Sequence, residues 1–187
     1  MESKGFDYAP KFLGIDEKNR EILSFIQGEA GNDPLKEYMW SNDVLKEIAK
    51  MLRLYHNAVS DFPLSDDWKP IDNTPYKVEV LCHNDFARYN IIFNQGKPIG
   101  IIDFDVVGPG PKLWDIAYTL YTCVALSRYF LPETDKEVVY YDALHHADRI
   151  KQRVRLFFES YGEGIEEDYL EMVLLRLEGL CKTITRK

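Results

Sequence analysis

Short apolar stretches separated by polar breaks fill the first part of the chain. Residues 10–15 and 21–26 are apolar stretches on either side of Asp16-Glu17-Lys18-Asn19, which predicts two short strands around a turn. The next stretch, residues 28–34, holds two glycines together with Asn32, Asp33 and Pro34. Such a concentration of turn-forming residues predicts a link between this small β segment and the rest of the chain.

Residues 42–59 have apolar side chains at helical spacing, preceded by residues that cap helices. Ser41, Asn42 and Asp43 each offer a side-chain oxygen to the first turn. The pattern predicts a helix with one buried face, in which His56 has a packing or capping role. Residues 61–76 contain four aspartates and three prolines and predict a loop. The apolar positions of the helix are Leu45, Ile48, Ala49, Leu52, Tyr55 and Val59.

The middle of the chain returns to strand patterns. Residues 78–81 predict a strand, and residues 90–93 and 98–102 flank a short turn containing Gly96, which predicts a hairpin. Residues 106–112 include Gly108-Pro109-Gly110-Pro111, which excludes a helix or a central strand and predicts a loop.

The remainder predicts helices over about 113–129, 136–161 and 166–183, with Gly162 and Gly164 as stop signals between the last two. Tyr118 and Tyr121 fall in the first of these helices, where core packing is the default interpretation and a place beside a substrate groove is the alternative. The order of elements predicts an α+β, mostly helical protein.

Composition narrows the class of protein. Of 187 residues, 45% are hydrophobic and 29% are charged, as in ordinary globular domains. The net charge is 23 − 31 = −8, which argues against a general nucleic-acid binder. No apolar run approaches the roughly 18 residues of a membrane span, and the N-terminal residues have no apolar signal region. Three cysteines without a CxxC pair favour reduced thiols. We therefore expect a cytoplasmic protein without nucleic-acid or membrane partners.

Residues 83–105 contain a set of polar residues typical of an enzyme active site. Between the strand at 78–81 and the hairpin lies His83-x-Asp85-x-x-x-x-Asn90, and the hairpin's second strand leads into Asp103-Phe104-Asp105. Antiparallel strands place their outer ends side by side, so Asn90 and Asp103 are expected to lie close together. Carboxylate and amide oxygens of this kind suit Mg²⁺ and phosphoryl transfer. The competing interpretation is that these polar residues only form turns.

The same residues resemble the aminoglycoside phosphotransferase and choline kinase family, small-molecule relatives of protein kinases. Residues 83–90 are similar to the family's His-Gly-Asp-Leu-His-x-x-Asn loop. Residues 102–105, Ile-Asp-Phe-Asp, are similar to its Ile-Asp-Trp/Phe-Glu/Asp motif, and residues 110–117 to Gly-x-Pro-x-x-Asp-Leu-Ala. Within the family the chain most resembles bacterial phosphotransferases labelled trifolitoxin-immunity-like.

The resemblance implies a protein kinase-like C-terminal lobe with a remnant of the N-terminal lobe sheet. Residues 1–34 would be the remnant and the hinge, and residues 35–187 the helical catalytic lobe. It also implies ATP and Mg²⁺ as cofactors, and transfer of the ATP γ-phosphoryl group to a hydroxyl of a small-molecule acceptor.

The resemblance assigns roles to residues one by one. Asp85 would be the catalytic base, and Asn90 and Asp103 would hold Mg²⁺. Asp105 is a further candidate, for a second ion. His83 would be structural and bond to backbone near Asp103. In addition, Asp115 would brace the catalytic loop by accepting backbone N–H bonds, and the hinge backbone at Phe25, Ile26 and Gln27 would meet adenine.

The catalytic loop departs from the family pattern in ways that affect the assignment. Asn84 stands where the family has Gly, and residues 86–89, Phe-Ala-Arg-Tyr, replace a Leu-His-Pro-Gly run. We expect Arg88 to point toward the phosphate region, where it would act with Asp85. The alternative is that Arg88 only forms a surface salt bridge.

The resemblance covers only the family's C-terminal two-thirds or so. No Gly-x-Gly-x-x-Gly precedes Asp85, and no strand resembling Val-Ala-Ile-Lys precedes the hinge. An alternative function is therefore a non-catalytic binding or immunity-type protein derived from the kinase fold. We further expect the apolar residues of 12–25 either to pair with a second copy as a homodimer or to fold down onto the helical body.

Overall fold

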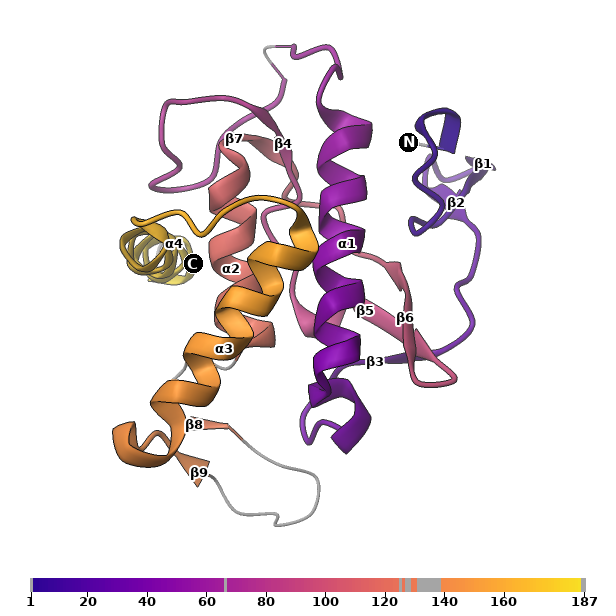
Figure 1. The fold of residues 1–187 in the computed structure, drawn as a ribbon. Helices are drawn as coiled ribbons and strands as arrows, with labels where there is room; N and C mark the ends of the chain where they lie inside the picture. Colours follow the sequence, from indigo (N-terminus) through magenta and orange to yellow (C-terminus); the bar gives the residue numbers. More distant parts are fainter. Residues whose placement is uncertain (1, 66, 125, 127–128, 131–138, 186–187) are drawn as a thin grey trace.

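The computed structural model describes residues 2–65, 67–124, 126, 129–130 and 139–185 (Figure 1). Its helices are α1 Asn42–Val59, α2 Lys112–Cys123, α3 Ala143–Tyr161 and α4 Tyr169–Thr185. Single 3₁₀ turns are η1 Glu2–Lys4, η2 Glu37–Trp40 and η3 Arg88–Asn90. The strands are β1 Phe12–Ile15, β2 Glu21–Leu23, β3 Glu29–Ala30, β4 Val80–Cys82, β5 Ile91–Asn94, β6 Lys97–Ile101, β7 Gly108–Gly110, β8 Tyr129–Phe130 and β9 Val139–Tyr140. The α+β, mostly helical prediction is confirmed.

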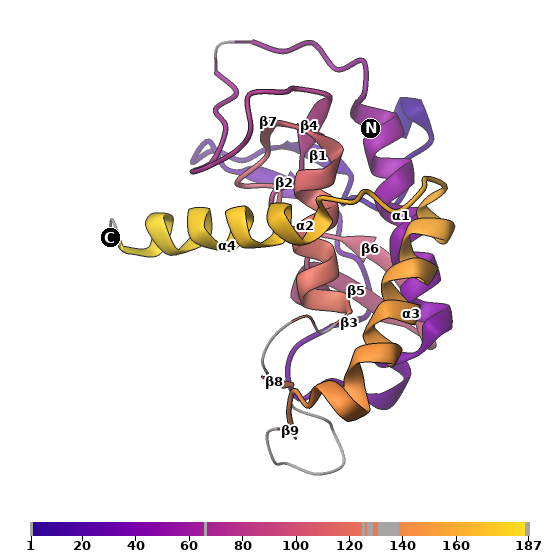
Figure 2. The same cartoon turned by 60° about the vertical axis from the view of Figure 1, so that its left-hand side comes forward.

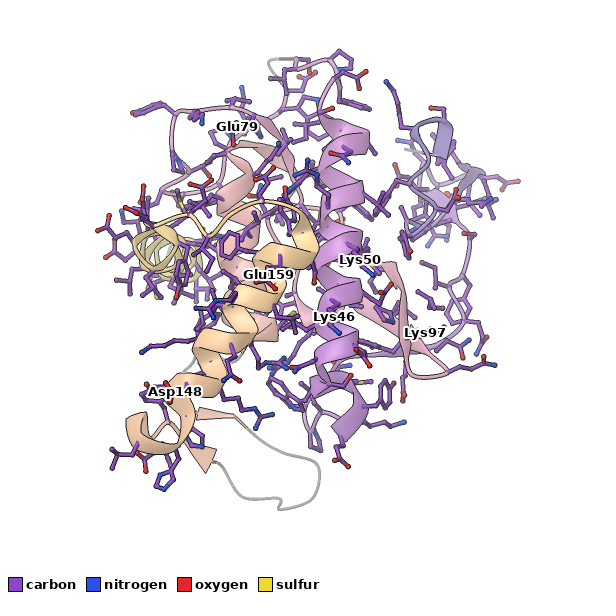
Figure 3. All side chains as sticks on the ribbon, in the orientation of Figure 1. Lys46, Lys50, Glu79, Lys97, Asp148 and Glu159 are labelled. Carbon is purple, nitrogen blue, oxygen red and sulfur yellow. The ribbon has the colours of Figure 1, made fainter. Side chains whose placement is uncertain are left out.

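Helix α1 has the predicted bounds and forms a layer with α3 (Figure 1). The Ser41 hydroxyl accepts the N–H of Val44 and caps its start. Its buried face includes Leu52 and Tyr55, which pack into the main core. Charged side chains such as Lys50 on α1 and Glu159 on α3 lie on the outer faces of the two helices (Figure 3). This amphipathic pairing places the core between the helices and the small sheets.

The predicted hairpin is β5–β6, and it gains a third strand that the sequence did not predict. Strand β3 pairs with β5 inside the stretch that we predicted as a link. A Cβ on Gly28 would lie 2.4 Å from the Phe93 carbonyl oxygen, and one on Gly31 would lie 2.5 Å from that of Arg88. These two glycines therefore allow close approach of two backbones rather than ending a strand.

Strand β7 corrects a second prediction, because residues 108–110 pair with β4 instead of forming only a loop. Pro109 stands opposite Leu81 in this two-stranded ladder, where its missing N–H is tolerated at a sheet edge. The pairing joins the residues before α2 to the strand that leads into the loop at residues 83–90.

The three C-terminal helices differ from their predicted bounds. Helix α2 ends at Cys123, and Tyr129 lies in β8 rather than in the helix. Helix α3 begins only at Ala143, because Asp142 caps it by accepting the N–H of Leu144. Residues 136–138 of the predicted helix lie outside the described residues. The stop at Gly162 is confirmed, since this glycine ends α3 with a φ of 90°.

Helix α4 projects from the body and contacts α2 along one stripe of its residues (Figure 2). Its buried residues, Val173, Arg176 and Gly179, recur at intervals of three. None of the described helices is long and apolar enough to cross a membrane.

The N-terminal hairpin β1–β2 stands beside the body next to α1 (Figure 1). Phe12 is 62% exposed and Phe25 is 82% exposed. The expectation that this hairpin folds down onto the helical body is therefore wrong, whereas its pairing with a second copy stays a prediction. Phe6 is buried against the ring of Tyr55 on α1, and β3 joins β5. Described residues between 2 and 34 thus make contacts with the rest of the chain, and the division at 34 stays a prediction.

Candidate active site

One buried carboxylate, that of Asp115, holds the loop between β4 and β5 through hydrogen bonds to its backbone. Asp115, in the first turn of α2, accepts the backbone N–H of His83 on Oδ2 at 2.7 Å and that of Asn84 on Oδ1 at 2.8 Å. This is the bracing role that the resemblance implied for Asp115. Asn84 has a φ of 64°, a left-handed conformation that asparagine tolerates better than most residues. The departure from glycine at this position is therefore compatible with the loop.

Asp115 is itself held by a buried network that the sequence analysis did not find. His56 Nε2 lies 3.2 Å from Asp115 Oδ2, and His56 Nδ1 lies 2.7 Å from the Tyr161 hydroxyl. Both the histidine and the aspartate side chains are fully buried. The packing or capping role predicted for His56 is therefore incomplete, because its two hydrogen-bonding contacts connect α1, α2 and α3. The only signal in the sequence was a histidine on the apolar face of an amphipathic helix.

The carboxylate of Asp85 has a donor on each of its oxygens. Oδ2 accepts Nδ2 of Asn90 at 2.8 Å, and Oδ1 accepts the hydroxyl of Tyr89 at 2.6 Å. Asn90 Nδ2 also bonds to the Asp85 backbone oxygen at 3.0 Å. Because its nitrogen faces Asp85, the Asn90 amide directs Oδ1 away from that carboxylate. Asp85 and Asn90 are therefore brought together through the amide nitrogen of Asn90.

The hairpin also brings Asp103 next to Asn90. The N–H of Ile102 bonds to the Asn90 backbone oxygen at 3.0 Å, so Asp103 immediately follows the residue paired with Asn90. Asp103 is exposed and has a φ of 66°. Asp105 is also exposed, two residues further along the turn. Within the described part of the chain, no three His, Cys, Asp or Glu side chains form a cluster that could hold a metal ion. A metal set built only from carboxylates is thus not seen there, and the candidate ligands are Asn90 and Asp103.

His83 lies at the centre of these acidic groups. Its Nδ1 accepts the N–H of Asp85 at 3.3 Å, and Nε2 makes no hydrogen bond of normal geometry. Burial lowers the pKa of His83, while the charges of Asp115, Asp85 and Asp103 and the backbone of Ile102 oppose that shift. The ring also lies against Phe104, 4.6 Å between centroids. His83 therefore packs the loop against the Asp103 turn as a neutral group.

Arg88 is engaged in contacts that differ from the expected one. Its guanidinium lies 2.6 Å from Asp33 Oδ2, donates to the Thr122 carbonyl at 3.2 Å and stacks over the Trp40 ring at 5.6 Å. These partners come from η2, α2 and the segment before η2. The arrangement favours the salt-bridge alternative over a phosphate contact.

Two of the three residues predicted as the hinge, Ile26 and Gln27, contact the β5–β6 hairpin. The carbonyl of Gln27 accepts Nδ2 of Asn94 at 3.1 Å. The side chain of Ile26 packs so closely on Gly100 that a Cβ there would lie 2.6 Å from Ile26 Cδ1. Phe25 is exposed, which leaves its ring open to a ligand. Ile26 and Gln27 therefore lie against the β5–β6 hairpin, whose second strand ends at Ile101.

An aromatic group lies beside Asp85, of which the sequence analysis named Tyr118 and Tyr121 only as an alternative beside a substrate groove and did not name Tyr89. The hydroxyls of Tyr89 and Tyr118 are 2.9 Å apart, and Tyr118 stacks on Tyr121. Burial raises the pKa of Tyr89 far above its usual value, and the bond to Asp85 adds to this shift. The Arg176 guanidinium lies 4.4 Å from the centre of the Tyr118 ring and donates to the Asn84 carbonyl. Helix α4 thus contributes a buried cation to the wall of the site.

A helical lobe with a strand–loop–hairpin unit and a buried aspartate under the loop has the fold of kinase-like phosphotransferases. Residues 39–157 match the model of the phosphotransferase enzyme family, APH. The chain belongs to that family. The match includes Asp85, Asn90, Asp103 and Asp115.

Known proteins agree with this assignment. The chain is 33% identical over 121 residues to a trifolitoxin immunity protein of Rhizobium leguminosarum bv. trifolii, covering 58% of this chain and 42% of that protein. It is 28% identical over 102 residues to an aminoglycoside 3'-phosphotransferase of Escherichia coli, covering 54% and 36%. The solved aminoglycoside phosphotransferase APH(3'')-Id from Streptomyces rimosus has the same fold, with a TM-score of 0.57, 14% identity and coverage of 96% and 76%. The chain thus spans about two-fifths of the curated relatives it matches.

Proposed function

We propose that this chain carries the catalytic lobe of an ATP-dependent phosphotransferase that moves the γ-phosphoryl group to a hydroxyl of a small molecule. The observation that supports it most is the position of Asp85. Its carboxylate accepts a hydrogen bond from the Asn90 amide, and the backbone of its loop is hydrogen-bonded to the Asp115 carboxylate. A carboxylate fixed in this way suits the acceptance of a proton from an attacking hydroxyl.

The oxygen atoms of the site fit a magnesium ion. Asn90 would offer its amide oxygen and Asp103 its carboxylate, and Mg²⁺ takes few protein oxygens while keeping water and phosphate ligands. When bound, the ion would neutralise charge on the phosphates. Asp105, exposed like Asp103, would be a candidate for a second ion. The segment Phe25, Ile26 and Gln27 would contact the adenine of ATP along its backbone.

A solved protein of the same fold binds a nucleotide together with a small molecule. APH(3'')-Id has been solved in complex with ADP and streptomycin, with a TM-score of 0.56 to this chain. At 14% identity this likeness concerns the fold, so the acceptor of the present chain stays unassigned.

A second candidate function is a non-catalytic binding or immunity-type protein. The observation that favours it is the 33% identity to the trifolitoxin immunity protein, a higher identity than that to the aminoglycoside 3'-phosphotransferase. In that case the site would bind a ligand or nucleotide without turning it over.

Titration with Mg²⁺-ATP by calorimetry, together with phosphate release, tests both candidates. Under the first, the wild type binds ATP in the micromolar range and releases phosphate, and Asp103→Asn weakens binding at least tenfold. Asp148→Asn, an exposed carboxylate on α3 (Figure 3), is the matched control and should behave as wild type. Binding without any turnover would favour the second candidate, and no heat at millimolar ATP would contradict the first.

A further inference from the structure

The hydroxyl of Tyr89 donates a hydrogen bond to Oδ1 of Asp85, the carboxylate oxygen that Asn90 does not bind. Asn90 Nδ2 donates to Asp85 Oδ2 at 2.8 Å, and the Tyr89 hydroxyl donates to Asp85 Oδ1 at 2.6 Å. A base has to lie about 2.6–3.2 Å from the oxygen whose proton it accepts. A hydroxyl that reacts at Asp85 would therefore need the position where the Tyr89 oxygen now lies.

The direction of the hydrogen bonds is set by the chemistry of the groups. A carboxylate only accepts, so Tyr89 donates its single proton to Asp85. The bond between the two phenols must then be donated by Tyr118 to Tyr89. The oxygen bound to Asp85 thus both donates and accepts, as an alcohol can. An ammonium group cannot replace it, because it has no lone pair to accept from Tyr118.

The two tyrosines differ in how firmly they are held. Tyr118 is buried, with Arg176 over its ring at 4.4 Å and Tyr121 stacked against it. Tyr89 is 37% exposed and belongs to the three-residue turn η3. The ring of Tyr89 can therefore leave while Tyr118 stays in place to donate to an incoming hydroxyl.

We propose that Tyr89 is a specificity-determining residue that occupies the acceptor-hydroxyl position on Asp85, and that it keeps water from this carboxylate until an alcohol acceptor displaces its phenol. This inference rests on the proposed phosphotransferase function. It adds that an alcohol acceptor displaces the phenol of Tyr89 from Asp85, and that the chain's own side chain suppresses transfer to water.

Tyr89→Phe removes one oxygen atom and leaves the ring. Without an acceptor, the variant should release phosphate from Mg²⁺-ATP about tenfold faster than wild type, because water can then bond to Asp85. Its nucleotide affinity and melting temperature should stay close to those of wild type. The gain should vanish in the double variant Tyr89→Phe/Asp85→Asn. Tyr76→Phe makes the same chemical change at a fully exposed tyrosine and should leave phosphate release unchanged.

The outcomes separate this inference from the proposed function. If both proteins bind ATP and release phosphate, and Tyr89→Phe does so at the wild-type rate or more slowly, the inference is overturned and the proposed function stands. A slower rate would mean that Tyr89 supports the orientation of Asp85. If both bind ATP and neither releases phosphate, the inference fails together with the proposed function, in favour of the non-catalytic candidate. If neither protein binds ATP, both the inference and the proposed function fail.

Discussion

Asp115 and His83 are joined by a hydrogen bond of 2.7 Å from the backbone N–H of His83 to the buried carboxylate of Asp115. They are 32 residues apart in sequence, and the bond ties the first turn of α2 to the end of β4. The same carboxylate accepts a second backbone N–H, from Asn84. Since backbone donors that are buried without a partner are costly, this carboxylate keeps the loop in one conformation.

Asp115→Asn should destabilise the protein. An amide has one acceptor oxygen, and its nitrogen would face a backbone N–H that it cannot bond. We expect the free energy of unfolding to fall by about 2–4 kcal/mol, the range for breaking a buried charged network. Urea denaturation measures this change. Asp148→Asn should shift it by less than about 0.5 kcal/mol, and equal stability of the two variants would contradict the bracing role of Asp115.

The pH dependence of stability should contain a contribution from His83. Burial lowers the pKa of His83 in the folded state below its unfolded value of about 6.5. The unfolded chain therefore binds more protons in the window below that value, so stability is full above it and is lost as the pH falls through the window. Melting temperatures of wild type should drop between pH 7 and pH 5.5. His83→Phe, which retains an aromatic ring beside Phe104, should drop less; a parallel drop would refute the contribution.

The elements with strong local patterns were predictable from the sequence. Helix α1 matches its predicted bounds because a capping serine and a regular apolar stripe act together. Strands β3 and β7 were missed for a common reason. In both, glycines that ordinarily indicate turns instead permit backbones to approach closely, as at Gly31 and Gly108, where a Cβ would lie 2.5 and 2.3 Å from a carbonyl oxygen. Only the tertiary partner reveals which role a glycine has.

The candidate site was predictable where one hairpin supplies both partners. Asn90 and Asp103 flank the two strands of the β5–β6 hairpin, so antiparallel pairing alone indicated that they lie close together, and the Ile102 N–H bonds to the Asn90 carbonyl. The contacts of His56 with Tyr161 and of Arg176 with Tyr118 join helices far apart in sequence. No local pattern contains that information. For the same reason the sequence could not decide whether Arg88 points toward phosphate or forms a salt bridge, because its partner Asp33 lies 55 residues earlier.

Arg88→Met should leave nucleotide affinity unchanged and lower stability. The ion pair with Asp33 is partly exposed, so solvent screens it, and the variant also loses the bond to the Thr122 carbonyl. We expect a loss of about 1 kcal/mol. Urea denaturation and ATP calorimetry measure the two properties. A tenfold loss of ATP affinity with unchanged stability would restore the phosphate role of Arg88.

The predicted homodimer through the N-terminal hairpin can be tested by light scattering. Strands β1 and β2 form a two-stranded sheet whose apolar residues Phe12, Leu13 and Ile22 are exposed, a surface that favours association. We expect a dimer at high protein concentration that dissociates in Ile22→Lys. Glu17→Lys, in the exposed turn of the same hairpin, should remain a dimer. A monodisperse wild-type monomer would contradict this prediction.

Gly179→Ala should loosen α4. A Cβ on Gly179 would lie 2.2 Å from the carbonyl oxygen of Asp72, a backbone atom that cannot turn aside. Alanine normally stabilises a helix interior by about 1 kcal/mol relative to glycine, but overpacking of about 1–3 kcal/mol should outweigh it here. Because α4 carries Arg176, its displacement should also weaken the contact with the Asn84 carbonyl. Gly164→Ala is the matched control, since its Cβ would meet open space. We expect urea midpoints to fall for Gly179→Ala alone; equal midpoints would show that α4 adjusts to the added methyl group.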